Sequence, residues 1–194
     1  KEATYLTLNK MRQKCTETQE IDYVEEIIQK LMVLEVNAKA EKAYEIIAEA
    51  NDKVIIFTEY RASQAYLQWY LYTKGITSVL FNGKFKKNKR DWMKQLFKDQ
   101  AQVLIATESG GEGINLQFCH HVINYDLPWN PMKLEQRIGR VHRLGQEHDV
   151  HIYNLAIHNT IEEDILDLLY VKLDVFEKVV GDLDDILSSF KKTI

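Results

Sequence analysis

The segment KVIIFTEY, Lys53–Tyr60, decides the fold class, because helical spacing of apolar residues gives way there to a β-rich run. Its uninterrupted apolar centre is typical of a strand buried on both faces of a parallel sheet. Later runs have the same character and alternate with helical segments: ITSVLF, AQVLIAT, HHVINYD and VHIYNLAI. This alternation predicts an α/β fold in which helices flank a parallel sheet.

Helical spacing also occurs on both sides of this array. Before it, residues 1–36 predict a helical extension or linker, and Asn37 is a suitable cap for a further helix. The α/β lobe itself is expected over residues 37–159, followed by a second helical extension over residues 160–194. One face of that extension is expected to carry Ile161, Ile165, Leu168 and Leu169.

The composition is that of an ordinary globular protein, with 45% hydrophobic and 28% charged residues in a chain of 194. There is no apolar run long enough to span a bilayer and no signal-peptide pattern, so we expect no membrane partner. The net charge of −4 hides a basic centre, because residues 53–155 carry 14 basic and 9 acidic side chains. Such a centre permits contact with nucleotides or nucleic acid.

The two cysteines, Cys15 and Cys119, lie far apart and provide no disulfide framework, which suits a reducing cytosol. The run Cys119-His120-His121 invites comparison with a zinc site. It lacks the paired spacing of zinc ligands, and His121 opens an apolar run. We therefore predict no metal there.

The segment EQRIGRVHRLGQ, Glu135–Gln146, concentrates arginine with little acid nearby. If it is helical, Gln136, Arg140 and Arg143 fall within about 60° of one another on one face. Like charges at this spacing cost a few tenths of a kcal/mol, and Gly139 inside a helix costs about 1 kcal/mol relative to alanine. Two interpretations stay open: an external anion binds this face, or the face is solvated and the arginine stems pack down.

The segment TESGGEGIN, Thr107–Asn115, follows the third predicted strand, and its glycines can expose backbone N–H groups to a phosphate. TEY, FNGK and DLPWNP follow other strands, at the edge where parallel sheets collect ligands. The chain contains no GxxxxGK[ST], no GxGxxG and no DExx run at the end of a strand. It therefore lacks the residues that bind and cleave a triphosphate on their own.

In order and spacing, FTEY, FNGK, VLIATESGGEGINLQ, VINYDLPWNP and QRIGRVHRLGQ resemble the second RecA-like lobe of superfamily-two helicases. The chain looks most like the Swi/Snf-type DNA translocases, in particular the bacterial branch related to the RNA-polymerase-associated ATPase. The resemblance covers roughly residues 37–172 and implies a RecA-like parallel sheet flanked by helices. Arg137 and Gly139 stand where many eukaryotic relatives carry alanine and aspartate, which is closer to the bacterial branch.

The resemblance implies a role for each matching residue. QRIGRVHR matches motif VI, so Arg140 and Arg143 would be arginine fingers for ATP on a partner lobe, with Gln136 lining the cleft. In motif V, matched by TESGGEGIN, the residues implied to approach ATP or to relay between sites are Gly111, Gly113 and Asn115. The residues implied to contact nucleic acid are Thr58, Tyr60, Arg61, Gly83, Lys84, Arg90, Thr107, Trp129 and Asn130.

The resemblance further implies that the intact protein hydrolyses ATP and moves along duplex DNA. ATP and Mg²⁺ would be held mainly by a first RecA-like lobe outside this chain, and this chain alone would be inactive. The expected partners are that lobe, duplex DNA, and RNA polymerase or another protein–DNA complex, in the bacterial cytoplasm at the nucleoid. The helices from residue 160 would brace the two lobes.

Three other interpretations remain. An RNA helicase lobe is disfavoured by RVHRLGQ and DLPWNP. A non-catalytic binding or regulatory module that retains the fold is disfavoured by the arginine-rich face of Glu135–Gln146. An ordinary dinucleotide-binding domain is nearly excluded by the absent fingerprint glycines.

Overall fold

The computed structural model describes residues 11–14, 18–33, 37–83, 85–108, 115–142 and 148–180, with the side chains of 18, 31–33 and 172–180 left aside. The chain divides into two compact units, residues 1–41 and 42–194. In the first unit, helix α2 (Thr18–Val33) buries Val24 and carries an exposed ion pair between Glu26 and Lys30. The three-part domain division expected from the sequence stays a prediction.

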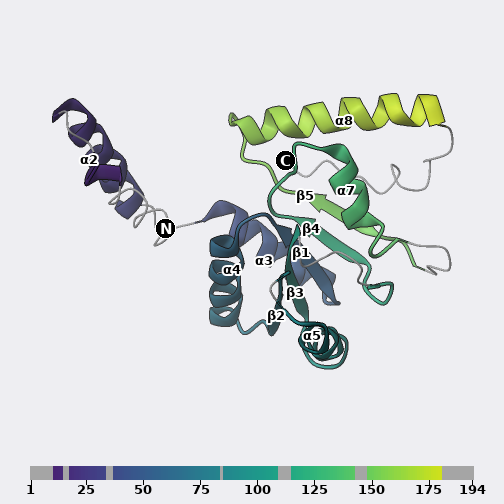
Figure 1. The fold of residues 1–194 in the computed structure, drawn as a ribbon. Coiled ribbons are helices and arrows are strands. Elements are labelled where there is room, and N and C mark those ends of the chain that lie inside the picture. The colour runs from purple at the N-terminus through teal and green to yellow at the C-terminus, as the bar shows by residue number, and fades with distance from the viewer. Residues whose placement is uncertain are drawn as a thin grey trace. The chain divides into compact units, whose positions relative to one another are not determined.

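The second unit is built on a five-stranded sheet whose strand pairs are all parallel (Figure 1). The strands are β1 (Val54–Thr58), β2 (Ser78–Phe81), β3 (Val103–Thr107), β4 (His121–Asn124) and β5 (His151–Asn154). They lie in the order β2-β3-β1-β4-β5. The central strands β1 and β3 are buried at every residue, whereas the edge strands β2 and β5 alternate with more exposed residues. The predicted parallel α/β sheet is confirmed.

Besides α2, the described helices are α3 (Ala38–Ala50), α4 (Arg61–Thr73), α5 (Lys87–Asp99), α7 (Pro131–Ile138) and α8 (Ile161–Val180). Helix α3 begins after Asn37, whose Oδ1 accepts a hydrogen bond from the Ala40 N–H at 3.1 Å, as its capping role predicts. Helix α4 is tied to the sheet by buried Gln64. Its Nε2 donates to the carbonyl oxygens of Phe81 (3.1 Å) and Ile105 (2.7 Å).

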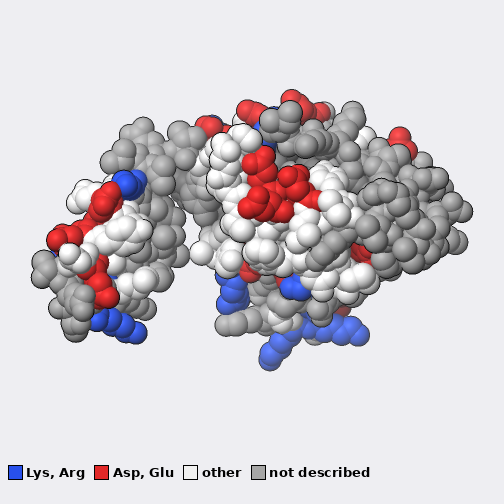
Figure 2. All heavy atoms as spheres, turned by 90° about the horizontal axis from the view of Figure 1, so that it is seen from above, with Lys and Arg blue, Asp and Glu red and all other residues white. Residues whose placement is uncertain are grey.

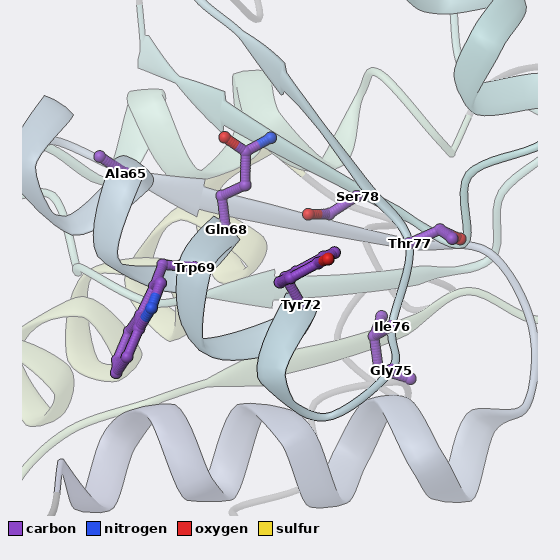
Figure 3. A pocket seen from close by; sticks show the side chains of 8 residues that line it. All are labelled: Ala65, Gln68, Trp69, Tyr72, Gly75, Ile76, Thr77 and Ser78. Atoms are coloured by element: carbon purple, nitrogen blue, oxygen red, sulfur yellow. The ribbon is translucent and has the colours of Figure 1, made fainter.

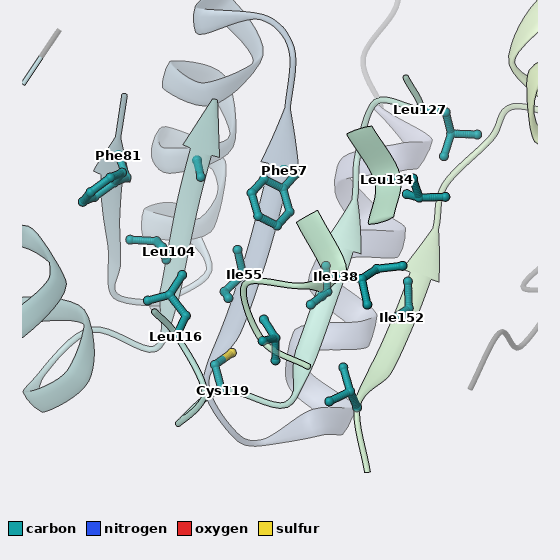
Figure 4. Packing of buried hydrophobic residues seen from close by; sticks show 14 of the residues in the cluster. Ile55, Phe57, Phe81, Leu104, Leu116, Cys119, Leu127, Leu134, Ile138 and Ile152 are labelled. Carbon is teal, nitrogen blue, oxygen red and sulfur yellow. The ribbon is translucent and has the colours of Figure 1, made fainter. Parts of the chain in front are cut away.

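One face of the sheet carries the main hydrophobic cluster (Figure 4). Alternate strand residues point into it, among them Ile55, Phe57, Leu104 and Ile152. Helix residues of the same cluster are Phe97 of α5, Leu134 and Ile138 of α7, and Ile165 and Leu169 of α8. Helices α5, α7 and α8 therefore cover this face and hold the strand ends in place for the candidate site.

The apolar face predicted for the C-terminal helix is correct for only half of its residues. Ile165 and Leu169 are buried, whereas Ile161 is 59% and Leu168 40% exposed. The buried stripe runs through Leu166 instead, because a helix lying on a flat cluster buries only a narrow sector of its circumference. Within the described part of the chain, no helix is long and apolar enough to cross a membrane.

Candidate functional site

The segments that follow the strands meet at the carboxyl edge of the sheet. The register places Thr58 of β1 opposite Thr107 of β3, and Asn124 of β4 opposite Asn154 of β5. All four side chains are buried. Because buried polar groups require hydrogen-bond partners, this edge is expected to hold a polar network.

Arg137 of α7 lies at the centre of that network, with a side chain only 2% exposed. Its guanidinium donates to Glu108 Oε2 at 2.6 Å, to Asn124 Oδ1 at 3.1 Å and to the carbonyl oxygen of Asp126 at 2.8 Å. Its Cζ lies 5.5 Å from the centroid of the Phe57 ring. These partners are needed because an unpaired buried charge costs several kcal/mol.

Asp126 extends the network to the end of β1. Its carboxylate accepts hydrogen bonds from the Thr58 hydroxyl and, at 3.0 Å, from the Glu59 N–H. The Thr58 side chain is fully buried, so its hydroxyl serves a contact inside the lobe. The nucleic-acid contact implied for Thr58 stays a prediction.

The network also reaches the C-terminal helix. Asn124 Nδ2 donates to Asn154 Oδ1 at 2.8 Å, and both side chains are buried. Burial raises the pKa of Tyr170 on α8, and a hydrogen bond with Asn154 opposes that rise. The carboxyl edge is thus linked from α7 through β4 and β5 to α8.

The continuous helix considered for Glu135–Gln146 is wrong. Helix α7 ends at Ile138, Gly139 is its C-terminal cap, and Arg140 lies in a turn. The Arg140 N–H donates to the carbonyl oxygen of Arg137 at 3.1 Å, which is the tighter i→i+3 spacing common at helix ends. The cost of glycine inside a helix therefore does not arise here.

Two of the three predicted catalytic residues, Gln136 and Arg140, lie at the end of α7 and in this turn. Gln136 is exposed and Arg140 is half-buried, while Arg143 lies outside the described residues. The carbonyl oxygen of Arg140 accepts a hydrogen bond from the Leu116 N–H at 3.0 Å. The structure thus brings the turn that contains Arg140 beside the segment that begins at Asn115.

Of the three residues implied to approach ATP, Gly111 and Gly113 lie outside the described residues. Asn115 is exposed, and its side chain turns back on its own segment. Its Oδ1 accepts from the Gln117 N–H at 3.1 Å, and its Nδ2 donates to Gln117 Oε1 at 3.0 Å. Its approach to nucleotide stays a prediction.

The residues implied to contact nucleic acid differ in exposure. Thr58 and Thr107 are buried, and Lys84 lies outside the described residues. The exposed members are Tyr60, Arg61, Gly83, Trp129 and Asn130. Arg90 is half-buried with its Cζ 5.4 Å from the Phe81 ring centroid, and Asn130 Oδ1 also caps α7 by accepting from the Met132 N–H.

Charge is unevenly distributed over the second unit. Exposed or half-buried basic side chains concentrate on and just before α5: Lys86, Lys87, Lys89, Arg90, Lys94 and Lys98. Helix α8 begins instead with Glu162, Glu163 and Asp164. Figure 2, which views the α8 side, shows acidic side chains gathered over this face and basic ones along its lower margin. A polyanion would therefore be attracted to the α5 side rather than to α8.

A groove of about 540 Å³ lies beside the edge strand β2 (Figure 3). Its lining residues are Ala65, Gln68, Trp69 and Tyr72 of α4, with Gly75–Ser78 leading into β2. Trp69 is 60% and Tyr72 79% exposed. The lining has no charged side chain and no residue of the carboxyl-edge network, so this groove is separate from the candidate site.

The Cys119-His120-His121 run lies at the opposite, amino edge of the sheet. Burial raises the pKa of Cys119 to about 12, so its thiol stays protonated, and its Sγ lies 3.0 Å from the carbonyl oxygen of Lys53. Burial and the neighbouring His148 lower the pKa of His120. Among the described residues, no three acidic, histidine or cysteine side chains are arranged to hold a metal ion.

The sequence analysis did not predict that Glu108, Asp126 and Arg137 belong to one hydrogen-bonded network. Glu108 directly follows β3 and Asp126 closely follows β4, so both carried the signal of acidic residues at the ends of buried strands. Arg137 carried no such signal, because it is one of several arginines on an apparently basic segment. Only the tertiary structure distinguishes this buried arginine from half-buried Arg140.

Comparisons with known proteins agree with this architecture. The family model of the helicase conserved C-terminal domain matches residues 38–145, more than half of the chain. The chain is 59% identical to the uncharacterized ATP-dependent helicase YqhH of Bacillus subtilis (strain 168), over 98% of this chain and 35% of that protein. It is 35% identical to the RNA polymerase-associated protein RapA of Serratia proteamaculans (strain 568), over 68% of this chain and 14% of that protein.

The chain thus spans about a third or less of the length of these relatives. Among solved structures, the C-terminal part of the Fun30 ATPase domain superposes with a TM-score of 0.62 and 30% identity. That match covers 68% of this chain and 43% of the Fun30 chain. The chain therefore belongs to the helicase conserved C-terminal domain family and has the fold of the second RecA-like lobe of superfamily-two helicases.

Proposed function

We propose that this chain is the second motor lobe of an ATP-dependent DNA translocase, supplying arginine fingers to ATP and part of a nucleic-acid track. The observation that carries the proposal is that the turn containing Arg140 and the glycine segment, Thr107–Asn115, are joined at the carboxyl edge of the sheet by contacts at each described end of that segment. The Leu116 N–H binds the Arg140 carbonyl oxygen, and Glu108 binds Arg137. The ATP-dependent helicase relative supports the use of ATP.

Arg140 offers a half-buried guanidinium that suits a phosphate group. A first RecA-like lobe would hold ATP and Mg²⁺, and Arg140 and Arg143 would stabilise charge that develops on the transferred phosphoryl group. An arginine finger supplied in this way is worth roughly 10³–10⁵ in rate. Gln136 would line the same cleft from the exposed end of α7.

The nucleic-acid track would run over the exposed residues that follow the strands and the basic side of α5. Tyr60, Arg61 and Trp129 offer aromatic and cationic contacts, and α5 adds its lysines. Such contacts to the phosphate backbone give little sequence specificity and a steep dependence on salt. The RNA polymerase-associated relative supports RNA polymerase as a partner. The proposed location is the bacterial cytoplasm, at the nucleoid.

The test is ATP hydrolysis by this lobe joined to its P-loop lobe, measured without nucleic acid, with duplex DNA and with RNA. We expect duplex DNA to stimulate hydrolysis, and Arg140→Ala to lower the stimulated rate by roughly 10³-fold or more while DNA binding is retained. Lys42→Ala, which removes an exposed lysine paired with Glu45, is the matched control and should behave as wild type.

The outcomes separate the proposal from its alternatives. Stimulation by RNA and not by duplex DNA would identify an RNA helicase lobe. An absence of hydrolysis with every nucleic acid would favour a non-catalytic module. Equal loss of hydrolysis and DNA binding in Arg140→Ala would contradict the arginine-finger role, because it would indicate general structural damage.

A further inference from the structure

The glycine segment is attached at both of its described ends to the segment that carries the arginines. At the start of the segment, the carboxylate of Glu108 lies 2.6 Å from the guanidinium of Arg137. After it, the Leu116 N–H donates to the carbonyl oxygen of Arg140 at 3.0 Å. Arg137 and Arg140 are themselves linked by one turn, because the Arg140 N–H donates to the carbonyl oxygen of Arg137 at 3.1 Å.

We propose that the Arg137–Glu108 ion pair is a positioning pair that couples nucleic-acid binding to ATP hydrolysis. This inference rests on the proposed motor function, and it assigns a role to two residues for which the sequence analysis gave none. Neither side chain needs to touch ATP or nucleic acid. The pair instead fixes the start of the glycine segment relative to the turn that holds Arg140.

The remaining contacts of Arg137 explain why an arginine serves here. Its planar guanidinium also donates to Asn124 Oδ1 and to the carbonyl oxygen of Asp126, so one group joins the ends of β3 and β4 and the loop after β4. Asp126 in turn binds Thr58 at the end of β1. Each of these segments carries or adjoins residues of the proposed nucleic-acid track. A lysine, with a single nitrogen, could not reach all three acceptors in the same geometry.

A contribution to the free energy of unfolding does not by itself explain why Arg137 and Glu108 form a buried ion pair. Replacing a buried ion pair with apolar residues of similar volume is often neutral or stabilising, whereas removing one partner leaves a buried charge without compensation. The Arg137 side chain is 98% removed from solvent while Glu108 remains 28% exposed at the start of the glycine segment. A pair of this kind is therefore a specific link between two elements rather than an efficient source of folding free energy.

The test uses this lobe joined to its P-loop lobe and compares Glu108→Gln, Arg137→Met and the double variant Glu108→Met/Arg137→Met with wild type. The measured quantities are kcat with and without duplex DNA, KM for ATP, Kd for DNA and Tm. We expect the ratio of DNA-stimulated to basal kcat to fall roughly 10- to 100-fold, as for other small misplacements of catalytic groups. KM for ATP and Kd for DNA should change far less, because the pair contacts neither ligand.

The double variant separates positioning from folding. It removes both charges and keeps apolar volume, so its Tm should recover toward wild type while its stimulation ratio stays low. Glu45→Gln, which removes the exposed partner of Lys42, is the control for loss of an ion pair and should keep full stimulation.

Three results would overturn the inference. The first is a double variant that folds and is stimulated like wild type, which would make the pair merely structural and leave the motor function standing. The second is a loss confined to KM or Kd, which would place the pair in a binding site. The third is a wild-type protein that no nucleic acid stimulates, which would remove the motor function and the coupling together.

Discussion

The buried Arg137–Glu108 ion pair should show a large thermodynamic coupling, and the same lobe offers an exposed pair for comparison. The N–O distances are 2.6 Å for Arg137–Glu108 and 2.9 Å for Lys42–Glu45. The side chains are 2% and 28% exposed in the first pair but 41% and 57% in the second. The two pairs therefore differ mainly in their access to water.

The expected magnitudes follow from that difference. Two unit charges about 4 Å apart interact by about 4 kcal/mol at an effective dielectric constant near 20, and by about 1 kcal/mol in water. Partial exposure of Glu108 reduces the first value, so we expect a coupling free energy of about 2–3 kcal/mol between Arg137 and Glu108. For Lys42 and Glu45, three residues apart on a helix, we expect only a few tenths of a kcal/mol.

The assay is a double-mutant cycle for each pair, with the free energy of unfolding taken from urea denaturation followed by circular dichroism. Arg137→Met and Glu108→Gln form one cycle, and Lys42→Met and Glu45→Gln form the other. A coupling below about 1 kcal/mol for the buried pair, or equal couplings for both pairs, would refute the reasoning. Either result would mean that solvent screens the guanidinium despite its burial.

Three further predictions concern the rest of the lobe. The pKa values of His120 and His121 are lowered from 6.5 in the folded lobe, so below about pH 6.5 the unfolded chain binds more protons than the folded one. The free energy of unfolding, measured by urea denaturation at several pH values, should therefore fall as the pH drops below about 6.5. Cys119, with its pKa raised to about 12, should resist a thiol reagent at pH 8 in the folded lobe and react once the lobe is unfolded in urea. Gln64→Leu should lower the free energy of unfolding by about 1–3 kcal/mol, because two buried carbonyl oxygens lose their donor; no loss would mean that these oxygens find other partners.

The sheet could be predicted from the sequence because its signal is local. The continuous apolar run from Val54 to Phe57 favours a strand that is buried on both faces of a sheet. In the structure, these residues lie in β1, which is buried at every position. The other four strands could be located in the same way, although β5 ends at Asn154, before the end of the predicted run VHIYNLAI. The position of the candidate site at one edge of the sheet followed from the direction of parallel strands.

The end of α7 and the role of Arg137 could not be predicted in the same way. Periodicity continued past Ile138, but α7 ends there with Gly139 as its cap, and the carbonyl oxygen of Arg140 accepts a hydrogen bond from the distant Leu116 N–H. Burial of Arg137 depends on Glu108, which is distant in the sequence and becomes a neighbour only when β3 and α7 are in place. Contacts of this kind come from tertiary structure and leave no mark on local spacing.

The strand order has a consequence for how the lobe folds. The first strand in sequence, β1, is paired on both sides by late strands, Val54 with Val103 of β3 and with His121 of β4. Its partners are separated from it by on the order of 50 residues or more, so the centre of the sheet forms only after long loops have closed, which makes folding slow. A chain that ends before β4 leaves one side of this apolar strand without a partner and open to pairing with another molecule. We therefore expect β1 to β4 to fold as one cooperative unit, and shortened versions of the lobe that stop before β4 to aggregate.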